Sequence, residues 1–204
     1  MPKLSEKKKN LIRDEIYEAA VRVIVESGVD ATTMSKVAAE AGAAKGSLYN
    51  YFKDKSELLE YVFNRTIEPL DAEVESIIES NQPAAERLRA VLYAVFHYFD
   101  SKRKLFDFLL DQHEIQRLCN ARQSNGPPFF EQLITTAIEQ GEFRECDPRF
   151  HAALIYGATK GIAEEYVKRD GPWPVFEIVN SIWNFCLKGL RAETQTNTNE
   201  ANQS

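Results

Sequence analysis

The chain contains 204 residues, of which 44% are apolar, 11% aromatic and 27% charged, and this composition excludes a disordered protein and favours a packed core. No apolar run approaches the roughly 18 residues that a membrane-spanning helix requires, and we expect no secretory signal because the charged N-terminus lacks an apolar segment. The three cysteines (Cys119, Cys146 and Cys186) are widely spaced and match no metal-ligand pattern, which predicts reduced thiols in a cytoplasmic protein without a metal site.

The formal charge of −6 is unevenly distributed along the chain. Residues 1–60 contain ten Lys or Arg and ten Asp or Glu, whereas residues 61–204 contain 15 and 21 respectively. Residues 1–13 carry five of these positive charges against Glu6 alone. Such an asymmetry is compatible with a nucleic-acid partner for the first part of the chain. The basic run itself is either a solubilising leader or an arm that touches phosphates.

Helical periodicity dominates, and the first helix is predicted from about Lys7 to Ser27. Gly28 is predicted to end it as a left-handed cap. Thr33 is placed to cap a second, short helix, which Gly42 terminates. The residues expected to face inward from these two helices are Ile12, Ile16, Ala19, Ala20, Val23, Ile24, Met34, Val37, Ala38 and Ala41.

The stretch "AGAAKGSLYNYFKDKSELL" at 41–59 combines small residues with three rings and three lysines. A tight turn at 42–44 followed by a two-turn helix over 45–52 directs Leu48 and Phe52, which are four residues apart, toward the core. Asp54 and Glu57 stand in a capping-box relation and predict the start of the next helix. The residues then expected to face largely outward are Lys45, Gly46, Ser47, Tyr49 and Asn50.

Pro69 interrupts the apolar pattern of that next helix, and an interior proline costs about 3 kcal/mol unless the helix kinks or ends there. We therefore predict a seam between two domains at Pro69. No stretch alternates convincingly with a period of two, so the fold is predicted to be all-α. The remaining helices are expected near 83–99, 103–121, 128–140, 148–168 and 175–190.

Two short helices joined by a glycine-containing turn are typical of a helix-turn-helix that binds DNA. Lys45 can reach a guanine edge or a phosphate, and Tyr49 and Asn50 can meet base edges or methyl groups. Lys55, at the start of the next helix, suits a phosphate. Both lysines are alternatively ordinary solvated charges, and Tyr51 is alternatively a structural residue. The residues small enough to let the backbone approach the floor of the major groove are Ala43, Ala44, Gly46 and Ser47.

At the motif "TTMSKVAAEAGAAKGSLYNYFKDKSELL" (32–59) the chain resembles the tetracycline-repressor (TetR-type) family of transcriptional regulators. The motif is long and specific, and it implies a three-helix DNA-binding domain followed by a larger helical domain for ligand binding and dimerisation. Ala44 departs from the serine often found there, which removes a helix cap worth about 1 kcal/mol. The resemblance implies phosphate contacts from Thr33, Ser47, Tyr51 and Lys55, and base or groove contacts from Ala43, Ala44, Lys45, Gly46, Tyr49 and Asn50.

Aromatic side chains in the acidic part of the chain are candidates for lining an effector pocket between helices, although aromatics at helical spacing are more often plain core. A row of carboxylates at Asp107, Asp111 and Glu114 offers either a cation site or a solvated face. No constellation for catalysis appears, so we expect neither an enzyme nor a cofactor. The pocket candidates are Tyr93, Phe96, His97, Phe106, Phe129, Phe130, Tyr156 and Lys160.

The resemblance also implies a homodimer through the last two helices, whose broad apolar stripes include the small residues Gly157 and Gly161. The leading hypothesis is a cytoplasmic repressor that binds a palindromic operator on double-stranded DNA as a dimer and is released by a largely apolar small molecule. The alternative is a constitutive or architectural DNA-binding protein without an effector. The expected divisions are 1–60 (DNA binding), 61–192 (effector binding and dimerisation) and 193–204 (disordered tail).

Overall fold

The computed structural model describes the backbone of residues 4–110 and 128–190 and the side chains of 9–109 and 128–185. Regular structure in these ranges is helical, which confirms the all-α prediction. None of the described helices combines the length and the apolarity that crossing a membrane requires. The helices are α1 (Leu4–Ala31), α2 (Met34–Glu40), α3 (Lys45–Leu48), α4 (Lys55–Glu79), α5 (Ala84–Ser101), α6 (Arg103–Leu110), α8 (Pro128–Glu139), α9 (Pro148–Val167) and α10 (Val175–Leu190).

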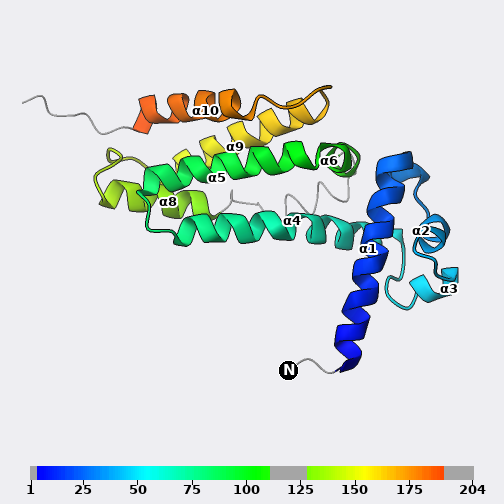
Figure 1. Cartoon of the computed structure of the whole chain (residues 1–204). Coiled ribbons are helices and arrows are strands. Elements are labelled where there is room, and N and C mark those ends of the chain that lie inside the picture. The colour runs from blue at the N-terminus through cyan, green and yellow to red at the C-terminus, as the bar shows by residue number, and fades with distance from the viewer. Residues whose placement is uncertain (1–3, 111–127, 191–204) are drawn as a thin grey trace, which may run out of the picture.

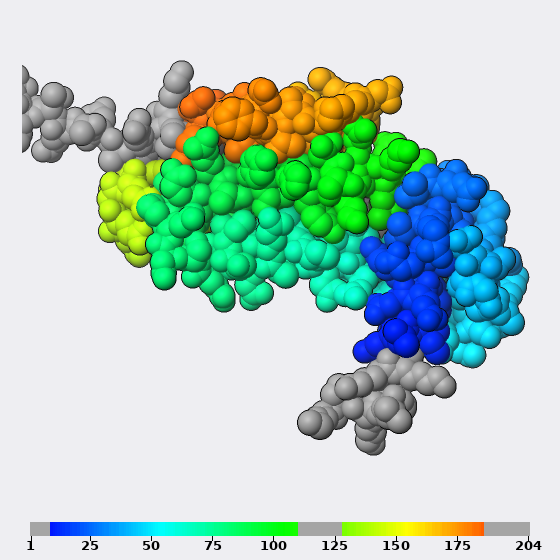
Figure 2. Space-filling view, in the orientation of Figure 1, coloured from blue at the N-terminus to red at the C-terminus, as the bar shows by residue number. Residues whose placement is uncertain are grey.

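Helices α1 to α3 form a head at one end of an elongated body, as Figures 1 and 2 show. In the head, α1 crosses the end of the body, and α2 and α3 lie on its outer side (Figure 1). In the body, α4 and α5 lie side by side, α8 and α9 pack on α5, and α10 covers α5 and α9. Helix α6 packs on α1, so it connects the head with the body.

The predicted boundaries of the first two helices are largely confirmed. The inward face of α1 is buried, and Gly28 breaks the helix with a φ of +79°, although a short helical stretch carries the element on to Ala31. Glycine fits this break because side chains rarely adopt positive φ. Thr33 caps α2 as predicted, since its Oγ1 accepts a hydrogen bond from the backbone N–H of Lys36 at 3.2 Å. Gly42, with a φ of +64°, ends the turn after α2.

Helix α3 is shorter than predicted, covering Lys45–Leu48 instead of 45–52. The backbone N–H groups of Tyr51 and Phe52 both donate to the carbonyl of Leu48, at 2.9 and 3.0 Å, so the chain leaves the helix in a tight turn. That turn places Phe52 in the core, where 1% of it is exposed. Ala44 stands at the N-cap without a side-chain hydrogen bond, as its departure from serine predicts.

Helix α4 begins at the predicted N-cap Asp54, and the reciprocal bond of Glu57 goes to the residue before that cap. Asp54 Oδ1 accepts from the backbone N–H of Glu57 at 2.9 Å, and the Lys53 N–H donates to Glu57 Oε2 at 2.7 Å. Helix α4 does not end at Pro69 but continues to Glu79, and the domain seam predicted there stays a prediction. Pro69 is exposed, while apolar residues beyond it remain buried and hold the second half of α4 against α5.

The predicted helices of the body are found close to their expected ranges. Asp147 and Pro148 open α9 as predicted, with Asp147 Oδ1 accepting from the N–H groups of Arg149 and Phe150 at 3.0 and 3.2 Å. The predicted helix over 103–121 is described only as far as Leu110, and Asp111, Glu114 and the tail 193–204 lie outside the described residues. The division at residues 60 and 61 falls inside α4 and stays a prediction.

Candidate nucleic-acid interface

The polar edge of α3 is uncovered, while its opposite side is anchored in the core. The side chains of Leu48 and Phe52 are 0% and 1% exposed and hold the helix against the head. Tyr49 is 47% exposed although it is aromatic. The exposed residues are those that the sequence directs outward, namely Lys45, Gly46, Ser47, Tyr49 and Asn50. Helix α3 lies at the outer margin of the head (Figure 1).

The turn after α3 is anchored to α1 by a cluster that sequence reasoning missed. The Arg13 guanidinium lies over the rings of Phe52 and Tyr61, with its Cζ atom 5.0 and 4.3 Å from their centroids. The two rings pack with centroids 5.2 Å apart. Tyr61 also donates to Asp14 Oδ1 at 3.4 Å, and burial together with this carboxylate raises the pKa of the tyrosine. The sequence around Arg13 gives no indication of this stacking, because the stacking depends on the packing of α1 against α4.

The other residues predicted to contact DNA lie around α3 and differ in how exposed their side chains are. Thr33 and Ala44 are exposed, whereas Ala43 and Tyr51 are half-buried, and Tyr51 packs against the core. The N–H of Ala43 donates to the carbonyl of Ala38 at 2.8 Å, which holds the turn close to α2. Thr33 already uses its hydroxyl oxygen as the cap of α2, so a phosphate contact would come from the hydroxyl hydrogen. These contacts stay predictions.

Lys55 is the predicted contact whose environment differs most from an open surface. Its side chain is half-buried, and its Nζ donates to the carbonyl oxygens of Val29 and Asp30 at 2.6 and 3.4 Å. The ammonium therefore binds the end of α1 in this structure. The predicted phosphate contact from Lys55 remains untested.

The effector-pocket candidates do not share one environment. Tyr93 and His97 are exposed on α5 and stack on each other with ring centroids 5.9 Å apart. Lys160 is exposed and lies 3.8 Å from Glu164, and Tyr156 is half-buried. The buried members are Phe96, Phe106 and Phe130, with Phe129 half-buried against Phe130 at 4.5 Å between centroids.

A buried tryptophan that the sequence assigns only to a turn joins the aromatic core at the α6 end of α5. Trp173 is 5% exposed, and its ring centroid lies 6.2 Å from that of Phe96 and 5.7 Å from that of Tyr166. Its backbone N–H donates to Asp100 Oδ1 at 3.1 Å. A tryptophan inside "DGPWP" is the sequence signal for this role, because so large a ring is usually well buried.

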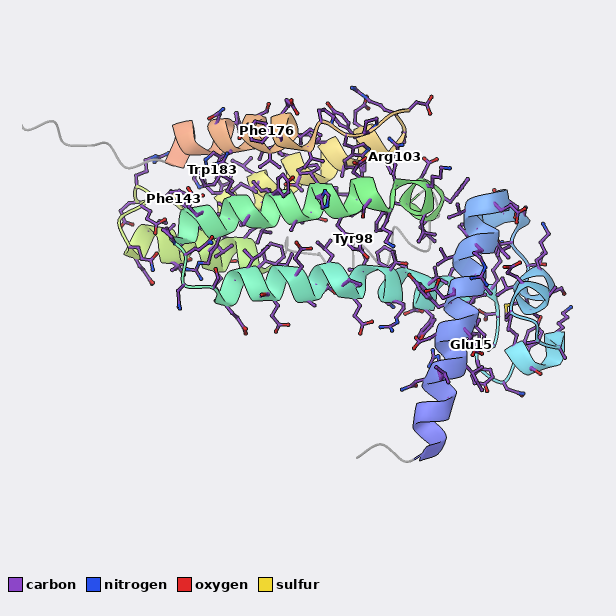
Figure 3. The ribbon with its side chains drawn as sticks, in the orientation of Figure 1. Glu15, Tyr98, Arg103, Phe143, Phe176 and Trp183 are labelled. Atoms are coloured by element: carbon purple, nitrogen blue, oxygen red, sulfur yellow. The ribbon has the colours of Figure 1, made fainter. Side chains whose placement is uncertain are left out.

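Two buried donors at this end of the body lack acceptors among the residues that the structure describes. They are Trp173 Nε1 and Arg103 Nη1, and Arg103 is the first residue of α6 (Figure 3). Buried donors are paired in most proteins, so each leaves hydrogen-bonding capacity for an acceptor group. No group of three or more His, Cys, Asp or Glu that could hold a metal ion occurs within the described ranges.

Helices α9 and α10 carry both the protomer's own core and an uncovered apolar surface. The stripe expected to form a dimer is mostly internal, because Ile155 on α9 and Trp183 on α10 are buried within one chain. Other large apolar side chains are exposed, including Phe185 of the expected stripe, and Gly157 and Gly161 are exposed with open space where a Cβ would stand. The exposed apolar side chains of these helices are Phe150, Leu154, Phe176 and Phe185.

Both parts of the chain match models of one protein family. Residues 16–62 match the model of the bacterial regulatory proteins of the tetR family, and residues 81–190 match that of the tetracyclin repressor-like C-terminal domain. The chain belongs to the TetR family. It is therefore a DNA-binding transcriptional regulator of a family that is not enzymatic, as the motif at 32–59 implies.

Relatives within the TetR family are similar over nearly their whole length. The fatty acid metabolism regulator protein of Bacillus subtilis is 25% identical over 182 residues, covering 86% of this chain and 94% of the relative. The transcriptional repressor KstR2 of Mycobacterium tuberculosis is 25% identical over 195 residues, covering 90% and 95%.

Two solved structures of transcriptional regulators share the fold. FadR from Bacillus subtilis in complex with stearoyl-CoA superimposes with a TM-score of 0.72 at 25% identity, covering 86% of this chain and 97% of that one. SmeT, the repressor of a multidrug efflux pump of Stenotrophomonas maltophilia, gives a TM-score of 0.75 at 24% identity, covering 89% and 91%.

Proposed function

We propose that this TetR-family regulator is a cytoplasmic repressor that binds a palindromic operator as a homodimer and is released by a small-molecule effector. The observation that carries the DNA-binding part is the free polar edge of α3 held from behind by Leu48 and Phe52. A recognition helix needs such an edge, because it must enter the major groove while its other side stays packed.

The side chains of this edge divide into two kinds of contact. Lys45, Tyr49 and Asn50 are exposed and carry groups that can read base edges, with Asn suited to adenine and Lys to guanine. Phosphate contacts that fix the register come from hydroxyl groups around the edge. The residues proposed for these are Thr33, Ser47 and Tyr51, and those proposed for close backbone approach are Ala43, Ala44 and Gly46.

The proposal of a dimer is supported by the exposed apolar residues of α9 and α10. Phe176 and Phe185 are 63% and 72% exposed. Burying such large apolar side chains against a second copy of the chain is favourable. The open space at Gly157 and Gly161 would let a partner helix approach closely. Two heads about 34–36 Å apart would then read two half-sites, and two half-sites give the affinity that one small head lacks.

The effector is proposed to be a largely apolar molecule with a hydrogen-bond acceptor. The aromatic cluster of Phe96, Tyr166 and Trp173 supplies the apolar surroundings, and the unpaired donors of Trp173 and Arg103 supply the polar ones. The names of similar proteins point the same way, since FadR was solved with stearoyl-CoA and a relative regulates fatty acid metabolism. A long-chain acyl-CoA is therefore the first probe to use.

The test is to select duplexes from a random library with the purified protein and to measure binding of the enriched sequence. We expect a palindrome with two half-sites and a complex that contains two protein chains. Asn50→Ala is the matched variant. It should lose base preference while the fold is kept, because Leu48 and Phe52 stay in place. Failure to enrich any duplex at low salt would contradict the proposal. If the operator is bound but no acyl-CoA releases it, the protein is a constitutive regulator toward that class of ligand.

A further inference from the structure

Helix α3 is joined to α1 through the turn that follows it. The carbonyl of Leu48, the last residue of α3, accepts hydrogen bonds from the backbone N–H groups of Tyr51 and Phe52 at 2.9 and 3.0 Å. The side chain of Phe52 is 1% exposed, and the Cζ atom of Arg13 on α1 lies 5.0 Å from the centroid of its ring. The end of α3 is therefore connected to α1 by one backbone contact and one side-chain contact, both of which involve Phe52.

The guanidinium of Arg13 is held on two aromatic rings at once. Its Cζ atom also lies 4.3 Å from the ring centroid of Tyr61 on α4, and the centroids of Phe52 and Tyr61 are 5.2 Å apart. The Tyr61 ring is itself fixed to α1, because its hydroxyl donates to Asp14 Oδ1 at 3.4 Å. The Nε of Arg13 is buried and has no acceptor among the described residues, so stacking holds this side of the group. Stacking on aromatic faces suits a planar guanidinium better than the ammonium of a lysine.

Few other contacts fix the end of α3. The helix has only four residues, and α2 is the main helix against which it packs. The turn before α3 is tied to α2 by the N–H of Ala43, which donates to a carbonyl of α2 at 2.8 Å. The other end of α3 depends on Leu48 and Phe52, which reach the core. Tyr49 and Asn50 lie between these two residues and are exposed, so the direction of their side chains follows the position of this end.

We propose that Arg13 is a positioning residue for DNA recognition. Its stacking on Phe52 and Tyr61 fixes the end of α3 and thereby the angle at which Asn50 meets a base edge. The inference rests on the proposed DNA binding through α3. Lys45 lies at the opposite end of α3, so its contact should depend much less on Arg13. Loss of the stack should therefore relax base preference at the half-site position that Asn50 reads and leave the position that Lys45 reads.

The experiment measures binding of Arg13→Met to the selected operator, to operators with single base changes and to a scrambled duplex. Methionine keeps an apolar stem and removes the planar charged group. We expect the preference for operator over scrambled DNA to fall about tenfold, with the loss concentrated at the position that Asn50→Ala also affects. Lys9→Met is the control, because Lys9 is exposed one turn earlier on α1 and its loss removes a positive charge from the same helix. The control should leave base preference unchanged.

Tyr61→Leu removes one ring of the stack and tests whether Arg13 acts through it. The effects of residues that act together are not additive, so Arg13→Met combined with Tyr61→Leu should lose no more preference than Arg13→Met alone. Tyr61→Phe keeps the ring and should retain most of the preference. Arg13→Lys keeps the charge but stacks less well, so it should fall between the wild type and Arg13→Met, and it serves if the methionine variant folds poorly. Full wild-type preference in Arg13→Lys, or additive losses in the double variant, would overturn the inference.

Salt dependence and hydrogen exchange separate this role from a direct phosphate contact. A phosphate ligand contributes about 0.9 to the slope of log K against log salt and weakens both duplexes alike. Arg13→Met should keep the wild-type slope, and a slope reduced by that amount with operator preference intact would contradict a positioning role. In the free protein, the amides of Tyr51 and Phe52 should exchange faster in Arg13→Met than in the wild type or Lys9→Met, and equal rates would also contradict it. Absence of any operator preference in the wild type would instead contradict the proposed function, while the exchange rates would still test the contact of Arg13 with the turn.

Discussion

The hydroxyl of Tyr98 on α5 donates a hydrogen bond to the backbone carbonyl of Thr66 on α4, three residues before Pro69. A proline inside a helix removes a backbone donor and disturbs the hydrogen bonds of the preceding turn. The Oγ1 of Thr66 donates to the Val62 carbonyl at 2.7 Å and lies 3.4 Å from the hydroxyl of Tyr17 on α1. The head and the body are thus connected at the turn that Pro69 weakens.

Tyr98→Phe is expected to lower the free energy of unfolding by about 1 kcal/mol, because it removes one interhelical hydrogen bond and leaves the ring packing on Phe106. Urea denaturation followed by circular dichroism measures the change. Tyr93→Phe is the matched control, since Tyr93 lies on the same helix and is 47% exposed. Equal effects of the two substitutions would show that the Tyr98 hydroxyl contributes nothing specific.

The same tyrosine predicts how stability depends on alkaline pH. Burial, followed by the neighbouring Tyr17 and Asp71, raises the pKa of Tyr98 above its ordinary 10.0. The folded state therefore holds this proton more tightly than the unfolded chain, so the stabilisation is complete below about pH 10 and is lost as the pH rises through the folded pKa. Melting temperatures measured from pH 8 to 11 should fall less steeply in Tyr98→Phe than in the wild type. Parallel curves would contradict this prediction.

Glu142 acts as a distant cap for α5, because its carboxylate accepts from the N–H groups of Ala84 and Ala85 at 3.1 and 2.8 Å. Glu142→Ala should cost about 1–2 kcal/mol of stability, since two amides at a helix N-terminus lose a charged acceptor. Glu142→Gln should cost less, because one acceptor oxygen remains. Chemical denaturation checks both, with Glu139→Ala at the exposed end of α8 as the control. A loss from the control as large as that from Glu142→Ala would contradict a capping role.

Asn50→Ala should relax base preference at one position of each half-site, by about 1–3 kcal/mol, because a bidentate side-chain contact is lost. Binding to a set of operators with single base changes measures the effect. The variant should fold as the wild type does, since Asn50 is exposed. An equal loss of affinity for every operator would show that Asn50 contacts the DNA backbone.

Gly157→Leu is expected to disrupt the dimer without disrupting the fold of each chain. A Cβ at Gly157 meets nothing within 4 Å in one chain, and replacing a glycine within a helix gains about 1 kcal/mol of helix propensity. The monomer should therefore be at least as stable, while the dimer dissociates because a partner helix can no longer approach. Sedimentation equilibrium measures dimer dissociation, and chemical denaturation measures the stability of the monomer. Gly157→Ala should weaken the dimer less, and a leucine variant that remains fully dimeric would place the interface elsewhere.

Trp173→Phe should weaken binding of an acceptor-bearing effector by about tenfold, because the indole N–H is lost while an aromatic ring stays beside Phe96 and Tyr166. Calorimetric titration with stearoyl-CoA measures the affinity, and an apolar ligand without acceptors should lose little. Equal losses for both ligands would indicate that ring volume, and not the N–H, matters.

The local structure of the head, and the family, could be predicted from the amino-acid sequence alone. Capping residues such as Thr33 and Asp54 act on amides within three positions, and apolar spacing directs Leu48 and Phe52 inward whatever the rest of the chain does. These features depend on neighbouring residues, so they can be read from the chain directly. The exposed edge of α3 follows from the same spacing, although the length of α3 does not.

The partners of residues that meet across helices could not be predicted from the sequence, because they depend on how the helices pack. Whether Lys55 faces solvent or the carbonyl of Val29 depends on where α1 ends in space, and whether Trp173 lies in a turn or in a core depends on α5 and α9. The helix through Pro69 likewise persists because packing on α5 outweighs a local penalty. Such contacts join residues tens of positions apart, and a local pattern carries no information about which distant surfaces will pack together.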